Sequence, residues 1–110
     1  MGSILDDIKK LLGIQLDETS FDVELLIHIN GAISVLTQLG IGPAIGYTII
    51  SKDDTWIPLI GDRKDLEMVK LAIYYRVRLQ FDPPQNSFLL KSFEERLNET
   101  EWRLSIAPTQ

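Results

Sequence analysis

The sequence predicts a mostly α-helical protein, a small helical bundle with a short N-terminal helix, three longer helices and a long irregular or short-β loop between the second and third. Apolar residues recur every three or four positions in several separate segments, and glycine or proline separates these segments. The chain has 110 residues, of which 45% are hydrophobic and 25% charged. This size and composition are typical of one soluble globular domain, expected to span residues 1–110.

The first helix is expected over residues 4–12. Ser3 is a suitable N-cap, and Asp6 supplies an acidic residue three positions later. Gly13 follows the apolar run and can adopt the left-handed conformation that often ends a helix.

The second helix is expected over about 20–39, where apolar residues recur at helical spacing. Either Thr19 or Ser20 could cap its free amide groups. Gly40 permits a left-handed cap and Pro43 removes a backbone donor, so the helix must stop before them.

The segment 44–62 has neither helical spacing nor clean alternation, and Pro58 lies between two apolar residues. We expect an extended loop that reaches away from the helical body, because loops of this length in compact proteins usually serve function. Deleting about 47–58 should then leave the protein folded but block its assembly with partners.

The third helix is expected over 65–81. Its apolar residues are spread over several sides, which indicates burial from several directions, some of them open to another copy of the chain. Asp82 ends this helix because a residue that precedes proline is pushed out of helical geometry. Pro83 and Pro84 then form a stiff corner that sets the angle to the next helix.

The last helix is expected over 87–104, with Asn86 or Ser87 as its cap. Residues 105–110 contain Pro108 and small polar side chains, which predicts a flexible C-terminal tail. We expect the core to contain eight residues of the longer helices: Leu25, Ile29, Ile33, Leu36, Val69, Ile73, Phe93 and Leu97.

The sequence offers little for catalysis, cofactors or metals. There is no cysteine, and His28 is the only histidine, so neither a thiolate site nor a histidine-rich metal site can form within one chain. The run GIGPAIG lacks the lysine of a phosphate-binding loop. We therefore predict no enzyme activity, no cofactor and no metal.

Charge is distributed unevenly along the chain. Residues 1–62 carry nine acidic and three basic side chains, a net of −6, and residues 63–110 carry seven and eight, a net of +1. An acidic half repels a phosphate backbone, which argues against sequence-specific DNA binding but not against DNA that merely passes by. No apolar run approaches the length of a membrane span, so we expect no membrane association.

The last helix has an apolar seam formed by Leu90, Phe93, Leu97 and Leu104. Two tryptophans are candidates for a partner interface: Trp56 in the irregular segment and Trp102, which lies off this seam. Tryptophan is enriched at protein interfaces. Packing in the core is the alternative role for each of them.

Several segments in order resemble the small head-to-tail connector (adaptor) proteins of tailed bacteriophages and of prophages in Gram-positive bacteria. These segments are LDETSFDVELLIHINGAISVLTQLGIGP, then TW, then LQFDPPQNSF, and a closing EWRL. The resemblance covers about residues 4–104.

The resemblance implies a virion protein, present in the host cytoplasm during assembly, that forms a homo-oligomeric ring. The ring, expected to be dodecameric, would lie beneath the portal protein, contact a stopper or tail-completion protein, and surround the passing genomic DNA. It also implies that the C-terminal region docks on the portal, with Trp102, Arg103 and Ile106 as the residues able to contribute. A helical regulatory or antitoxin-like dimer is the alternative, and an uncharacterised hydrolase would need convergent polar groups that the sequence does not offer.

Overall fold

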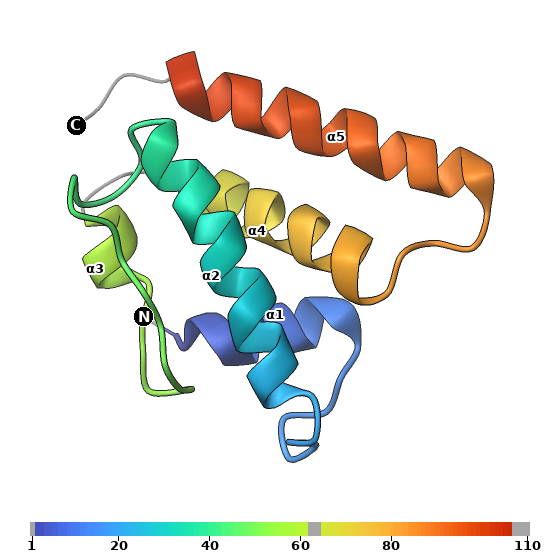
Figure 1. The fold of residues 1–110 in the computed structure, drawn as a ribbon, viewed down its shortest axis with the longest axis horizontal. Coiled ribbons are helices and arrows are strands. Elements are labelled where there is room, and N and C mark those ends of the chain that lie inside the picture. The colour runs from blue at the N-terminus through green and yellow to red at the C-terminus, as the bar shows by residue number, and fades with distance from the viewer. Residues whose placement is uncertain (1, 62–64, 107–110) are drawn as a thin grey trace.

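A computed structural model describes residues 2–61 and 65–106 of the protein. Figure 1 shows a mostly helical structure, as the sequence predicts. The elements in chain order are α1 (Ile4–Leu12), α2 (Asp22–Gln38), α3 (Ile57–Ile60), α4 (Leu66–Phe81) and α5 (Ser87–Ile106).

The expected bounds of α1 are confirmed, and its ends form as the sequence predicts. The Asp6 amide donates to Ser3 Oγ at 3.2 Å, and Gly13 has a φ of 79°. The expected cap of α2 is wrong: the N-cap is Phe21, whose side chain makes no capping hydrogen bond. Ser20 is unavailable because its amide and hydroxyl both donate to the Glu18 carboxylate.

Helix α4 lies at the centre of the bundle and packs against α1, α2 and α5. Figure 1 shows α5 running along one side of the molecule beside α4. These neighbours cover α4 on several sides. Helices of the same chain therefore bury many of the apolar side chains that point in different directions around α4.

The proline corner between α4 and α5 is present as predicted. Asp82 leaves helical geometry at φ −147° and ψ 69°, and Pro84 is buried. Asn86 caps α5 by accepting hydrogen bonds from the amides of Phe88 at 2.7 Å and Leu89 at 3.3 Å. The corner and the cap together fix where α5 starts and how it leaves α4.

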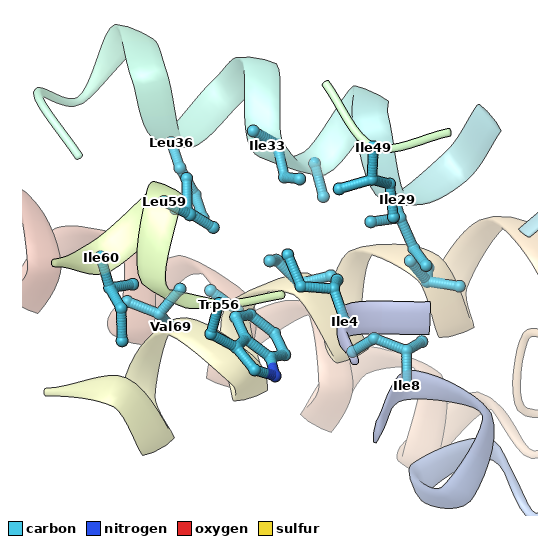
Figure 2. Close-up of a cluster of buried hydrophobic side chains, with 14 of the residues drawn as sticks. Ile4, Ile8, Ile29, Ile33, Leu36, Ile49, Trp56, Leu59, Ile60 and Val69 are labelled. Carbon is cyan, nitrogen blue, oxygen red and sulfur yellow. The ribbon is translucent and has the colours of Figure 1, made fainter. Parts of the chain in front are cut away.

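The prediction that 44–62 extends away from the body is wrong. This segment contains the short helix α3 and contributes Ile49, Trp56, Leu59 and Ile60 to the central apolar cluster. Figure 2 shows Trp56 between Val69 of α4 and Ile4 of α1. The segment folds inward because its apolar side chains are buried there.

Hydrogen bonds also hold this segment against the helices. The Asn30 side chain of α2 accepts from the Ile49 amide at 2.8 Å and donates to the Ile49 carbonyl at 2.9 Å. Gly42 permits a close approach to α3, because a Cβ atom there would lie 2.9 Å from Leu59 Cδ1.

Six of the eight expected core residues belong to the central cluster. Leu97 is buried outside that cluster, and Phe93 is only half-buried, so its assignment to the core interior is corrected. Phe93 packs against Tyr74 and Tyr75 of α4 instead. The expected tail 105–110 lies mostly outside the described residues, but Ser105 and Ile106 belong to α5.

Candidate partner interface

Helix α5 is fixed to α4 by a charged contact near its C-terminal end. The Arg76 guanidinium of α4 donates to both carboxylate oxygens of Glu101 on α5, at 2.6 and 3.0 Å. Such a two-point contact fixes orientation as well as distance. The buried Leu97 and Leu104 of α5 add apolar contact on the same inward side.

An aromatic group fixes α5 further along its length. The Phe93 ring packs edge-on against Tyr75, with ring centroids 5.5 Å apart, and lies 6.2 Å from Tyr74. The Arg78 guanidinium lies 5.4 Å from the centre of the Phe93 ring. These contacts hold α5 as one rigid element on α4, so its outward face has a fixed position.

The outward face of α5 presents the three C-terminal residues that the sequence analysis singled out. Trp102 is 62% exposed and Ile106 is 61% exposed. They are four positions apart and therefore share one face of the helix, opposite the buried Leu104. Arg103 lies beside them, exposed, and pairs with Glu99 at 2.8 Å.

Trp56 does not belong to this surface. Its side chain is fully buried, and its indole Nε1 donates to Asp7 Oδ2 at 2.7 Å. The Lys70 ammonium lies 5.6 Å from the centre of its ring. A partner cannot reach Trp56 in this conformation, so its assignment to the interface is wrong: it is a core residue that joins α1, α3 and α4.

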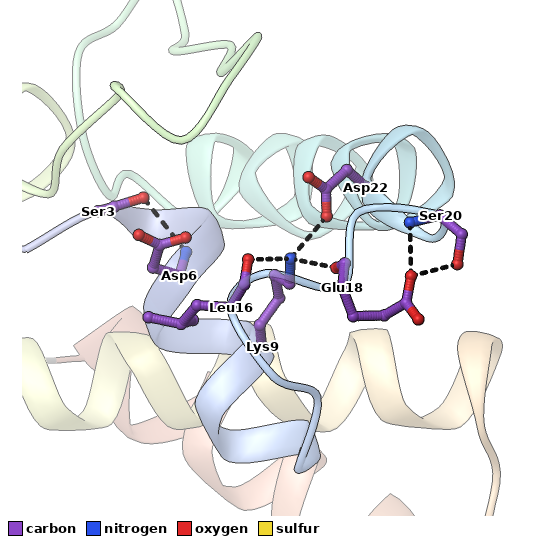
Figure 3. Close-up of polar contacts among 7 residues, drawn as sticks. All are labelled: Ser3, Asp6, Lys9, Leu16, Glu18, Ser20 and Asp22. Carbon is purple, nitrogen blue, oxygen red and sulfur yellow. Dashed lines mark hydrogen bonds and ion pairs between the residues drawn. The ribbon is translucent and has the colours of Figure 1, made fainter.

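A buried lysine, which the sequence analysis did not identify, ties the first two helices together. Lys9 is 1% exposed, and its ammonium donates to the carbonyls of Leu16 at 3.2 Å and Glu18 at 2.6 Å and to Asp22 Oδ1 at 2.9 Å (Figure 3). The sequence does contain one indication of this burial: Lys9 comes four residues after Leu5, so both lie on the same, buried face of α1. This contact fixes the connection between α1 and the start of α2.

His28 lies on the surface of the bundle rather than in a polar pocket. Its Nδ1 is 3.0 Å from Gln80 Oε1, and its Nε2 is 3.5 Å from Glu24. Among residues 2–61 and 65–106, no group of three or more histidine, aspartate and glutamate side chains is placed to hold a metal ion. No helix in the same described ranges is long and apolar enough to cross a bilayer.

The candidate functional site is therefore the outward surface at the C-terminal end of α5. The sequence profile of a family described as phage connector protein matches residues 4–110. The chain belongs to the phage connector protein family. No curated protein and no solved structure matches the connector.

Membership of this family gives the connector a structural role in a bacteriophage. It is a virion component that assembles with other head and tail proteins of the phage. The family is a structural one and is not known for catalysis.

Proposed function

We propose that the connector forms a homo-oligomeric ring at the head-to-tail junction, between the portal protein and a stopper or tail-completion protein. The C-terminal end of α5 docks on the portal, and the ring surrounds the path of the genome. The observation that carries this proposal is the rigid, exposed surface formed by Trp102, Arg103 and Ile106, called the α5 C-terminal surface below.

This surface has the chemistry of an interface centre. Tryptophan and arginine are enriched among the residues that contribute most to binding, and Ile106 adds an aliphatic contact on the same face. The Arg103–Glu99 pair is exposed on both sides, so it contributes little to folding, and the guanidinium can turn to a partner carboxylate at small cost. Because α5 is already held on α4, docking orders few additional groups.

The charge of the chain suits a channel through which DNA moves. The net charge is −5, and residues 1–62 carry a net of −6. Acidic side chains repel the phosphate backbone, so they do not hold the DNA in place. We therefore place the acidic half of the chain toward the channel and expect no sequence-specific DNA binding.

Portal docking is tested with Trp102→Ala, Ile106→Ala and a chain truncated after Leu104. Glu94→Ala is the matched control, since Glu94 is an exposed residue of the same helix outside the α5 C-terminal surface. We expect each of the three variants to weaken binding to the cognate portal at least about tenfold, or about 1.4 kcal/mol, and the control to bind normally. Melting curves should change little, because Trp102 and Ile106 are exposed.

Unchanged portal affinity in all three variants would place the portal contact elsewhere. The ring is tested by light scattering and electron microscopy of the portal–connector complex, in which we expect many connector copies on each portal assembly. A stable two-fold dimer that does not bind the portal would instead favour the alternative, a helical regulatory or antitoxin-like dimer.

A further inference from the structure

A hollow lies between α1, α2 and the loop at residues 50–52. Its volume is about 330 Å³, and its apolar lining comes from Leu5, Leu16, Leu26 and Ile50. The Lys9–Asp22 pair lines the same hollow, and Figure 3 shows how the ammonium is engaged by Leu16 and Asp22 there. A hollow of this size with an apolar lining matches the lower range of pockets that hold small organic groups.

The most exposed aromatic side chain of the described residues lies on a different helix. Phe88 is 86% exposed at the start of α5, and its neighbour Leu89 is 53% exposed. The proline corner and the Asn86 cap fix the backbone at this point. An aromatic ring held out in solvent on a rigid backbone leaves apolar surface that a partner could bury.

Phe88 and the hollow cannot meet readily within one chain, because α5 packs mainly on α4 while the hollow lies between α1 and α2. We propose that Phe88 of one copy inserts into the hollow of the next copy. The contact is heterologous, which means that two different surfaces of the same chain meet, and such contacts generate rings when the rotation closes. This inference rests on the proposed ring and names the two surfaces that build it.

Each of the two surfaces carries charged side chains of both signs. Lys91 and Glu95 lie one and two turns after Phe88, on the side of α5 that faces solvent. The hollow is lined in turn by Asp6 and Lys52. Within the described part of the chain, none of these four charged groups has an ion pair, so each is free to pair across the contact.

The other end of α5 is left for a different partner. Phe88 and Trp102 are 14 positions apart, a distance of about 21 Å along a helix. One helix can thus contact a second copy at its start and the portal at its end. This separation favours a second copy of the chain, and not the portal, as the protein that receives Phe88.

The test uses one variant for each surface. Phe88→Asp removes the inserted ring, and Ile50→Asp places a charge at the hollow, where Ile50 is 79% exposed. Ile45→Asp is the matched control, since Ile45 is an exposed aliphatic residue of the same loop that does not line this hollow. Circular dichroism melting curves check that all three variants fold.

Sedimentation velocity is then measured on the full chain up to about 1 mM. We expect the unmodified protein and Ile45→Asp to self-associate as concentration rises. Phe88→Asp and Ile50→Asp, each measured alone, should associate at least tenfold more weakly and therefore stay monomeric over this range. An equimolar mixture of Phe88→Asp and Ile50→Asp should form a one-to-one heterodimer and nothing larger, because each retains the surface that the other lacks.

Three results would overturn the inference: an unmodified protein that stays monomeric, a blocked variant that associates normally, or a mixture without heterodimer. Portal binding is measured on the same samples. If the heterodimer forms but does not bind the portal, the proposed portal docking is rejected and the contact between copies is retained. If Phe88→Asp still forms rings on the portal, the contact between copies is rejected and the portal docking is retained.

Discussion

The burial of Trp56 allows a direct comparison of the two tryptophans of the chain. In Trp56→Ala the core loses its largest fully buried side chain, a truncation that typically costs about 3 to 5 kcal/mol. At about 0.05 to 0.15 kcal/mol per residue, a protein of 110 residues has about 5.5 to 16.5 kcal/mol of stability in total. The substitution should therefore remove a large part of it. Trp102→Ala, on an exposed side chain, should change the free energy of unfolding by less than about 0.5 kcal/mol.

Trp56→Phe separates the packing of the ring from its hydrogen bond. It keeps most of the apolar volume but removes the donor to Asp7, a bond to a charged group of the kind that contributes about 1.5 to 3 kcal/mol. For Trp56→Phe we expect a loss near the low end of this range, because Asp7 is partly exposed and retains its ion pair with Lys70 at 3.3 Å. Urea titration followed by circular dichroism measures all three variants. A loss below about 1 kcal/mol for Trp56→Ala, or one equal to that of Trp102→Ala, would refute the burial of Trp56.

Deleting 47–58 should abolish the cooperative thermal transition seen by circular dichroism, because the deleted segment supplies part of the core; a normal transition would show that the helices suffice. Lys9→Ala should lower the free energy of unfolding, measured by urea titration, by about 2 to 3 kcal/mol, because two carbonyls and a carboxylate lose their hydrogen-bond donor. Lys10→Ala, at an exposed position of the same helix, is the control and should change the free energy of unfolding little. Burial, together with the negative charge of Asp54, raises the pKa of the Tyr47 hydroxyl above its ordinary value of 10.0. The folded state then favours the neutral phenol, so stability should fall as pH rises above about 10, and Tyr47→Phe should reduce that fall in urea titrations at pH 9 to 11.

Local signals in the sequence predicted both ends of α1 and the start of α5, although not the start of α2 or the end of α5. The Ser3 cap, the Gly13 turn and the Asn86 cap each depend on residues within three positions, so a short stretch of sequence contains the whole interaction. Helical spacing likewise identified the buried faces of α2 and α4. The same reasoning placed Trp102 off the apolar seam of α5, and that side chain is exposed.

Interactions between distant segments were not predictable in the same way. The loop around Ile49 folds inward partly because Asn30, 19 positions earlier, satisfies both of its backbone groups. Neither residue signals this pairing by itself. Lys9 is a similar case, because a lysine is buried only where several acceptors converge, and here they come from the following loop and the next helix.

The proline corner links these local rules to the proposed assembly. If Phe88 contacts the next copy and Trp102 contacts the portal, α5 must hold the two side chains at one distance and one angle. A continuous helix fixes the distance, the Arg76–Glu101 contact fixes its far end on α4, and Pro83 and Pro84 fix its near end. Any freedom at the corner would be repeated in every subunit of a closed ring, and the accumulated error would prevent closure. Under the proposed assembly, the stiffness of this corner would therefore be a requirement of the ring as well as a feature of the single chain.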